Sequence, residues 1–494
     1  MPTEDSWAVL EPIPEPSRGL SADVAIPLVV DLDGTLLLGD SLVENFSVVL
    51  FRKPIDALGA LLAIRDRAAF KRRLAGHALL ELADMPWRED LVALLRTERA
   101  RGRAVHLVTA ADQAVADGVA EALGLFDSAT GSDGVRNLKG EAKLAHLRAR
   151  FPDGFLYAGD SPADLPLFAA AKGAVLCDVA KSVAGAVATS GTPVLATLAR
   201  PRAGTRVWLK ALRVHQWSKN VLLFVPLFVG HVFTDPAKVA AAIAGFLVLS
   251  LMVSGTYLLN DIADLGADRR HPTKRRRAFA SGALSLTVGL TVAPLMIVCA
   301  IAAGALLSPA FALMLLIYLG LTTAYSLVLK REPLTDVFVI GCLFTLRVAM
   351  GAAVVGLGQS PWLLSFALAF FVSLALAKRH AEVMRAARND LVAIAGRGYR
   401  GDDWPLTLVF GVGAGLFSLI IMLLYLANDA APSGFYRHAE WLYAVPVLMA
   451  LWLQRIWLLA QRTELDDDPV VFALRDPRSL LLGTAVGVAF FVAI

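Results

Sequence analysis

The stretch at positions 26–35 reads IPLVVDLDGT, and it decides the fold of the first part of the chain. Its apolar residues form a short buried strand pattern, which two carboxylates, Asp31 and Asp33, follow directly. Outward from it, similar strand patterns occur at 104–108, 155–158 and 173–176, separated by mostly helical segments. Strands that alternate with helices predict a parallel sheet whose chemistry lies at the carboxyl ends of the strands.

Composition divides the 494-residue chain into a soluble part and a membrane part. The mixed, charge-rich sequence ends near position 220, and apolar runs of roughly 16 to 23 residues recur after it. The net charge of +4 is small for this length and argues against nucleic acid as a partner. Cys177, Cys299 and Cys342 lie far apart, which predicts reduced packing residues.

Boundaries follow from the same shifts in composition. We expect a flexible lead-in at 1–24, an α/β domain at 25–189, a linker at 190–206 and a membrane domain at 207–494. A helical insertion at about 39–101 predicts a small cap on the α/β domain. The N-terminus has no basic region followed by an apolar core, so we expect no cleaved signal peptide and a cytosolic first domain.

The membrane domain is predicted to be all-α and to cross the bilayer nine times. The expected spans are 221–233, 238–259, 284–306, 308–328, 334–356, 361–377, 406–427, 441–460 and 479–494. Threading them from a cytosolic N-terminus puts nearly all Lys and Arg of this half on the cytosolic side, with Arg437 alone opposite. This pattern predicts a multi-pass protein of the plasma membrane whose active sites face the cytoplasm.

The soluble part carries the residue types that phosphoryl transfer needs. One carboxylate of the Asp31 and Asp33 pair can attack phosphorus while the other donates a proton. Thr109 follows the second strand, and the third strand leads into GDSPAD at 159–164. The stretch NLKGEAK at 137–143 adds two candidate cations for a phosphate. The acidic residues can serve as magnesium ligands, because this ion prefers oxygen.

These four motifs resemble those of the haloacid dehalogenase superfamily, most closely its phosphoserine-phosphatase-like branch. The resemblance implies a Rossmann-like α/β fold in which Asp31 forms an aspartyl-phosphate and Asp33 is the general acid and base. It implies a magnesium site made by Asp31, Asp33, Asp160 and Asp164. Thr109 and Lys139 would bind the phosphoryl group, with Lys143 as the alternative cation. A degenerate domain kept as a scaffold is the competing interpretation.

The stretch at 260–277 reads NDIADLGADRRHPTKRRR and is the main ionisable cluster of the membrane half. If it is helical, Asp261, Asp264 and Asp268 share one face. Three such carboxylates repel one another unless a divalent cation lies between them and a polyphosphate, and magnesium on a diphosphate meets that need. The basic run at 274–277 can bind phosphate oxygens, or it can serve only as an anchor to lipid headgroups.

Other charged residues recur along the same predicted cytosolic layer. Tyr325 ends the fourth span, Lys330 follows it and Asp336 opens the fifth, and Lys378 and Arg379 close the sixth. Inside the fifth span lies Arg347, for which we expect a phosphate or an acidic partner because an unpaired charge there is costly.

Residues 205–494 resemble the UbiA superfamily of intramembrane transferases, through the NDxxDxxxD and YSxxLK patterns. RxxQWxKN at 213–220, HPTKR at 271–275 and AKRxxE at 377–382 are similar to its decaprenyl-phosphate phosphoribosyltransferase branch. Ala278, where a proline is common, departs from that pattern. The resemblance implies Mg2+, phosphoribosyl diphosphate as donor and polyprenyl (decaprenyl) phosphate as acceptor. It implies catalytic and metal-binding roles for Asp261, Asp264 and Asp268. It implies substrate binding by Lys219, Asn260, Lys274, Arg275, Arg277, Tyr325, Lys330, Asp336, Arg347, Lys378 and Arg379.

The presence of both domains in one chain, on the same predicted side of the membrane, predicts a bifunctional enzyme. The phosphatase-like domain would remove the 5-phosphate of the lipid product to give polyprenylphosphoryl ribose, a precursor of an arabinose donor for cell-wall polysaccharide. Alternatives are a prenyltransferase that uses a prenyl diphosphate, with the phosphatase acting on a soluble phosphoester, and a transporter, whose charges should lie near mid-membrane. The acidic tail at 466–476 can bind metal, dock a domain or be solvated. The sequence leaves a homo-oligomer open.

Overall fold

The computed structural model describes residues 20, 22–61, 74, 81–133, 137–199, 203–389, 397–432, 435–465, 472–473 and 475–494. The chain forms two compact units, Met1–Ala211 with Leu258–Val292, and Leu212–Tyr257 with Ala293–Ile494. Most of the predicted lead-in, part of the predicted cap and the acidic tail at 466–471 lie outside the described residues.

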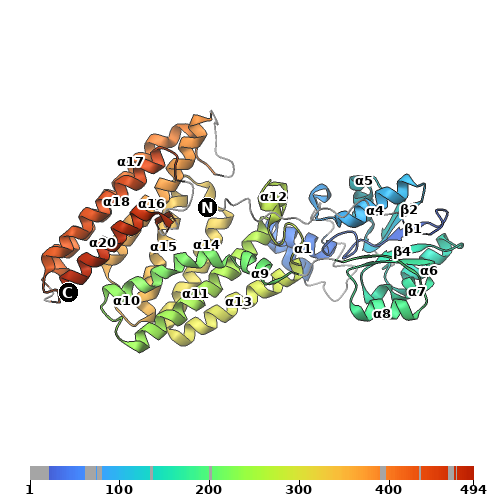
Figure 1. The fold of residues 1–494 in the computed structure, drawn as a ribbon, viewed down its shortest axis with the longest axis horizontal. Coiled ribbons are helices and arrows are strands. Elements are labelled where there is room, and N and C mark those ends of the chain that lie inside the picture. Colours follow the sequence, from blue (N-terminus) through green and yellow to red (C-terminus); the bar gives the residue numbers. More distant parts are fainter. Residues whose placement is uncertain are drawn as a thin grey trace. The chain divides into compact units, whose positions relative to one another are not determined.

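The first unit contains a six-stranded parallel sheet in the order β3-β2-β1-β4-β5-β6 (Figure 1). The strands are β1 (Leu28–Val30), β2 (Val105–Asp112), β3 (Ser128–Ser132), β4 (Leu156–Gly159), β5 (Gly173–Cys177) and β6 (Val194–Leu198). The predicted parallel α/β domain is confirmed, and β1, β2, β4 and β5 are the predicted strands. In contrast, β6 falls inside the predicted linker at 190–206, where this half-exposed edge strand lies between glycine and proline residues that are typical of a linker.

Helices cover both faces of this sheet (Figure 1). Leu28 and Val30 of β1 pack on one side against α4 (Glu89–Ala100) and α5 (Gln113–Leu123). Val29 faces the opposite cluster, formed with α6 (Glu141–Arg150), α7 (Leu165–Ala170) and α8 (Lys181–Thr189). Successive strand residues point to opposite faces, so a fully apolar strand such as β1 belongs in the middle of this sandwich.

The helical insertion predicted after β1 is described in part. It contains α1 (Ser41–Arg52) and α2 (Pro54–Leu61), which share a small apolar cluster of their own. The predicted cap at 39–101 also included α4, but Leu91 and Leu95 of α4 pack into the sheet core. Helical periodicity shows that α4 has an apolar face, and it does not show which surface that face covers.

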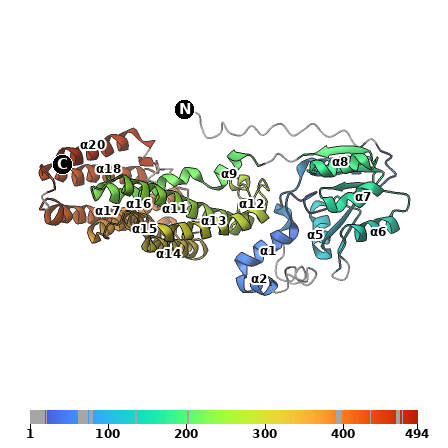
Figure 2. The same ribbon diagram turned by 90° about the horizontal axis from the view of Figure 1, so that it is seen from below.

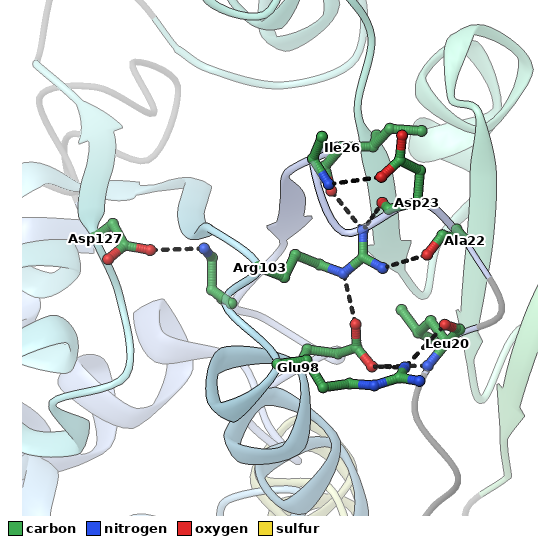
Figure 3. Close-up of polar contacts among 10 residues, drawn as sticks. Leu20, Ala22, Asp23, Ile26, Glu98, Arg103 and Asp127 are labelled. Carbon is green, nitrogen blue, oxygen red and sulfur yellow. Dashed lines mark hydrogen bonds and ion pairs between the residues drawn. The ribbon is translucent and has the colours of Figure 1, made fainter.

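A buried ion pair ties the start of the domain to α4 (Figure 3). The Arg103 Nε donates to Glu98 Oε2 at 2.5 Å, and the Leu20 amide donates to Glu98 Oε1 at 2.7 Å. The Arg103 guanidinium also donates to the backbone carbonyls of Ala22, Asp23 and Ile26 (Figure 3). These bonds join the segment before β1 to the segment before β2, so they fix how these two neighbouring strands enter the sheet.

Seven described helices are long and apolar enough to cross a membrane, by length and composition. They comprise α11 (Pro236–Ala263), α13 (Leu286–Leu307), α14 (Pro309–Leu327), α15 (Thr335–Val354), α16 (Pro361–Arg388), α17 (Trp404–Tyr425) and α18 (Ala444–Gln461). A shorter apolar helix, α20 (Pro477–Ala493), packs beside α18 (Figure 1, Figure 2). The protein is an integral membrane protein, and the count of nine spans is not confirmed. The predicted sixth span, which was to end at 377, continues as helix to Arg388.

The first predicted span, 221–233, has no long α-helix. After α9 (Thr205–Ala211), a 3-10 helix, η4 (Val214–Phe224), leads into the short α10 (Val225–Val229). Side chains three apart lie in one row on a 3-10 helix. Trp217 and Asn220 of that row donate to Ser254 Oγ at 3.0 Å and Ser250 Oγ at 3.1 Å on α11.

Candidate functional site

The loop after β1 carries the first carboxylate pair, Asp31 and Asp33. The Ser41 amide donates to Asp33 Oδ1 at 2.7 Å, which links this loop to the start of α1. Gly34 has φ +75, and a Cβ there would lie 2.0 Å from Asp160 Oδ2. Only glycine therefore permits both the backbone conformation and the close approach of the Asp160 carboxylate.

Asp31, Asp160 and Asp164 form the group that could hold a metal ion among the described residues, and Asp33 is not part of it. One oxygen from each of the three lies within 4.8 Å of the others. Burial, and then the charges of Asp31 and Asp164, raise the pKa of Asp160 to about 7. Crowded, partly buried carboxylates of this kind are the oxygen donors that Mg2+ prefers, so the residues fit this ion.

Lys143 lies beside the first aspartate. Its Nζ is 2.9 Å from Asp31 Oδ1, and the side chain is only 2% exposed. Lys139 is exposed instead, so the structure places Lys143 in the position expected of Lys139. The reason is local: α6 begins at Glu141, so Lys143 lies in its first turn and faces the sheet, whereas Lys139 precedes the helix.

Two further buried residues, Tyr157 and Arg88, support this site. The Tyr157 hydroxyl donates to Asp164 Oδ1 at 2.8 Å and accepts from Lys143 Nζ at 3.2 Å. The Arg88 guanidinium donates to the carbonyls of Thr35 at 2.8 Å and Gly34 at 3.0 Å, which braces the loop. Neither residue lies in a recognisable motif, so no signal in the sequence could have found them.

Thr109 and Asp33 complete the set predicted for phosphoryl transfer. Leu107 of β2 pairs with Val30 of β1, so the buried Thr109 lies at the same edge of the sheet as the aspartates. Burial, and then the nearby Asp40 charge, raise the pKa of Asp33 to about 7. A carboxyl group that holds its proton near neutral pH is suited to general acid catalysis.

The acidic stripe, defined as Asp261, Asp264 and Asp268, spans the junction of α11 and α12 (Leu265–Arg270). The Asp264 amide donates to the Asn260 carbonyl and the Asp268 amide to the Asp264 carbonyl, each at 2.9 Å. Because these i to i−4 bonds continue across the junction, the predicted helical spacing is retained.

Arg277 neutralises part of the acidic stripe. Its Nη1 lies 3.2 Å from Asp261 Oδ1 and 2.6 Å from Asp268 Oδ2. These two carboxylates are buried, whereas Asp264 is half-buried. Arg277 therefore lies between two carboxylates of the stripe, and among the described residues the group close enough to hold a metal ion is Asp31, Asp160 and Asp164, not the stripe. Lys274 and Arg275 are exposed in η5 (Lys274–Arg276), and Asn260 is half-buried.

Asp336, in the second unit, is fully buried and surrounded by donors. Its carboxylate lies 2.8 Å from Arg379 Nη2 and 3.2 Å from Arg397 Nη1, and it accepts from the Tyr399 hydroxyl at 2.7 Å. Arg397 also donates to the Tyr325 hydroxyl at 3.3 Å. The predicted role of Asp336 as a substrate-binding acid does not fit this environment, because the arginines occupy its oxygens. It orients two guanidinium groups instead.

Arg379 keeps a donor for another group. It pairs with Glu382 as well as Asp336, yet its buried Nε has no hydrogen-bond partner among the described residues. Lys330 and Lys378, predicted for the same layer, are half-buried. Arg397 and Tyr399 were not predicted, because their segment has no motif of its own.

Arg347 is buried within α15 and contacts neutral acceptors. It donates to Asn220 Oδ1 at 3.1 Å, the Tyr318 hydroxyl at 2.9 Å and the Leu343 carbonyl at 2.6 Å. The acidic partner expected for it is not found among the residues that the structure describes. Lys219 Nζ and the Arg347 guanidinium carbon lie 5.9 Å and 5.3 Å from the ring centroid of Phe344. Two cations on one ring are a setting for an anionic ligand.

The fold and these clusters define a membrane-embedded enzyme with a separate α/β hydrolase-type domain. The UbiA prenyltransferase family matches residues 222–475, and haloacid dehalogenase-like hydrolases match residues 28–169. The chain belongs to the UbiA prenyltransferase family and carries an N-terminal haloacid dehalogenase-like domain.

Several relatives are similar to this chain. It is 47% identical to an uncharacterized protein, y4nM, from Sinorhizobium fredii, over 95% of this chain and 92% of the relative. Nodulation protein NoeC from Azorhizobium caulinodans is 32% identical over 58% of this chain and 93% of its own length. A decaprenyl-phosphate phosphoribosyltransferase from Mycobacterium tuberculosis is 36% identical over 37% of this chain and 61% of its own length. A UbiA homolog from Archaeoglobus fulgidus bound to DMAPP and Mg2+ has a TM-score of 0.45 at 15% identity, covering 58% of this chain and 98% of that structure.

Proposed function

We propose that this enzyme transfers 5-phosphoribose from phosphoribosyl diphosphate to a polyprenyl phosphate such as decaprenyl phosphate. The observation that carries the proposal is the similarity to mycobacterial decaprenyl-phosphate phosphoribosyltransferase within the family match. The acidic stripe and the buried cations of the membrane helices supply groups for both charged substrates. The reaction takes place at the cytoplasmic face of the plasma membrane.

The transfer needs a diphosphate leaving group and a bound nucleophile. Asp261, Asp264 and Asp268 would hold Mg2+, which supplies positive charge to the departing diphosphate. Arg277 adds a guanidinium at the same place. Lys219 and Arg347 bind the lipid phosphate, whose oxygen attacks the anomeric carbon of ribose as the carbon–diphosphate bond breaks.

The haloacid dehalogenase-like domain then removes the 5-phosphate. Asp31 attacks phosphorus while Asp33 protonates the departing ribose oxygen, and Lys143 and Thr109 hold the phosphoryl oxygens. Water, deprotonated by Asp33, releases phosphate from Asp31. Asp31, Asp160 and Asp164 would hold the Mg2+ that supplies positive charge to the phosphoryl group. The product, polyprenylphosphoryl ribose, is a substrate from which epimerisation gives an arabinose donor for cell-wall polysaccharide.

A labelling experiment tests both steps. Purified full-length protein is incubated with Mg2+, polyprenyl phosphate and phosphoribosyl diphosphate that carries radioactive phosphorus at its 5-position. We expect the native protein to release labelled inorganic phosphate, Asp31→Asn to retain label in the lipid, and Asp264→Asn to form no labelled lipid. Retention of the 5-phosphate by the native protein would refute the coupling of the two steps.

A second candidate is a prenyltransferase that takes a prenyl diphosphate, with the hydrolase domain acting on a soluble phosphoester. The family description favours it. Separate incubations with each labelled donor distinguish the candidates: the first candidate predicts labelled lipid from phosphoribosyl diphosphate, and the second predicts labelled product from prenyl diphosphate alone.

A further inference from the structure

The helix that carries the end of the acidic stripe is attached to the hydrolase domain within the first unit. Arg269 of α12 donates to Glu44 of α1 through Nη2 at 2.7 Å and Nη1 at 3.1 Å. The two side chains are only 7% and 2% exposed. A bidentate, buried pair of this kind fixes both distance and orientation.

Neighbouring groups complete this docking interface, which we define as Glu44, Met85, Arg269 and Gly282. Arg269 Nη1 lies 3.2 Å from the Met85 sulfur. Gly282 has φ +72, and a Cβ there would lie 3.1 Å from Leu38 Cβ and Pro86 Cβ. A cavity remains beside the pair, lined by residues that include Ser47, Phe51, Ile262 and Gly266. Apolar packing is therefore incomplete beside the pair, and Glu44 with Arg269 is the buried ion pair of this interface.

The pair acts on the acidic stripe through adjacent residues. Asp268 and Arg269 are neighbours in α12, and they contact opposite partners: Asp268 pairs with Arg277, whereas Arg269 pairs with Glu44. The helix is therefore held on two sides. Without the Glu44 contact, Arg277 and the exposed pair of Arg270 with Glu81 would still contact α12, but the buried ion pair would be lost, and the carboxylates of Asp264 and Asp268 would be held less firmly.

We propose that Glu44 and Arg269 are positioning residues for the membrane transferase, so that the hydrolase domain holds the acidic stripe in a geometry that binds the metal-bound diphosphate. The proposal rests on the proposed role of the acidic stripe. It makes the hydrolase domain a structural part of the transferase, in addition to any hydrolysis that it performs.

Hydrogen–deuterium exchange of the full-length protein in detergent, without metal, tests the docking. We expect Glu44→Gln and Arg269→Met each to speed exchange in residues 261–271, and the double variant to add little beyond either single change. The matched control is the exposed pair Arg270 and Glu81, which joins the same two regions. Arg270→Gln and Glu81→Gln should leave exchange unchanged.

Metal binding tests whether the docking interface positions the acidic stripe. In an Asp31→Asn, Asp160→Asn background, which disables the hydrolase metal site, binding of Mn2+ is followed by electron paramagnetic resonance. Glu44→Gln should weaken this binding about tenfold, the size typical of residues that orient metal ligands. Hydrolysis of a soluble phosphomonoester by Arg269→Met with native aspartates shows that the domain is folded.

The outcomes distinguish the two hypotheses. Unchanged exchange in α12, or additive effects of the two single variants, would overturn the docking. Faster exchange with unaltered Mn2+ affinity would overturn the positioning role. If the native protein makes no ribosyl lipid but exchange and Mn2+ affinity change as expected, the positioning stands and the proposed donor is wrong.

Discussion

At the scale of single residues, Lys143 determines whether Asp31 can act as a nucleophile. Burial raises the pKa of Asp31, while the adjacent Lys143 charge opposes that rise and favours the carboxylate. Lys143→Met should therefore reduce hydrolysis of a soluble phosphomonoester by about a hundredfold or more, the range for removing one buried electrostatic contact.

Lys139 provides the matched control for that prediction. It is exposed, four positions earlier in the same segment, and Lys139→Met should change the rate less than twofold by the general tolerance of exposed positions. If Lys139→Met reduced the rate of hydrolysis more than Lys143→Met, Lys139 would be the phosphate-binding residue. Both rates are read from phosphate release at saturating Mg2+.

The same residues show what could be predicted at this scale. Asp31, Asp33, Asp160 and Asp164 could be located because they directly follow apolar strands, and parallel strands bring their carboxyl ends together. The choice between two lysines depends on the residue at which α6 begins, which composition does not determine. Tyr157 reaches the site from within β4, where an aromatic residue is ordinarily part of the core.

At the scale of elements, Glu98 joins α4 to the segments that enter β1 and β2. Glu98→Gln would leave the buried Arg103 without its charge partner, which costs about 3–5 kcal/mol. We expect the hydrolase activity of the full-length variant to be lost at a lower temperature than that of the native protein. Arg99→Gln removes an exposed pair with Asp127 and should have little effect.

This ion pair also predicts a pH dependence. Burial alone would raise the pKa of Glu98, but bonds from Arg103 and the Leu20 amide lower it below the ordinary value of 4.5. A carboxylate with a lowered pKa stabilises the fold above its ordinary pKa, and the stabilisation is lost as pH falls through the lowered value. The difference in inactivation temperature between native and Glu98→Gln protein should therefore shrink below about pH 4.5.

In the membrane unit, Gly411 permits three helices to meet. A Cβ on Gly411 would lie 2.1 Å from the Trp457 ring, and the Gly411 carbonyl accepts from Ser373. Gly411→Ala should destabilise this unit by about 1–3 kcal/mol through overpacking. Gly413 lies two residues later in α17 with open space around it, so Gly413→Ala should be neutral or stabilising. Aggregation temperature in detergent compares the two variants.

Helices were predicted well where the sequence has a long apolar run, and poorly where it has none. The long helices α11 and α13 to α18 match apolar runs, but α16 extends past its apolar portion because Arg379 and His380 are buried in polar contacts. The 3-10 winding of η4 has no compositional signal. Such winding is maintained by partners on α11, which are tertiary contacts.

At the scale of the whole molecule, the distribution of charge predicts which loops share a side of the membrane. Arg331 and Arg437 are both exposed, and α15, α16 and α17 lie between them in the chain. If each of these three helices crosses the membrane, the two residues lie on opposite sides. In a Cys299→Ser background, Arg437→Cys should react with a membrane-impermeant maleimide in intact cells, and Arg331→Cys only after the cells are opened. Labelling of both in intact cells would refute the proposed orientation.

The division into a soluble and a membrane half could be predicted from the amino-acid composition. The segments that make up each compact unit could not be predicted in this way. Leu258–Val292 belongs to the first unit, although it lies between two apolar helices. That assignment depends on pairs such as Glu44 with Arg269, which are 225 positions apart. No local pattern encodes a partner at that distance.

The contact of η4 with α11 has a simple consequence for insertions and deletions. Three residues of a 3-10 helix advance about 6 Å, and four residues of an α-helix advance about 6 Å as well. Trp217 and Asn220 are three apart, and their acceptors Ser254 and Ser250 are four apart in the reverse direction. The donors on η4 and the acceptors on α11 therefore have the same axial spacing and run in opposite directions. An insertion or deletion of three residues in η4 keeps the donors facing the serine hydroxyls of α11. A change of four residues, which an α-helix would tolerate, turns the donors away from those acceptors.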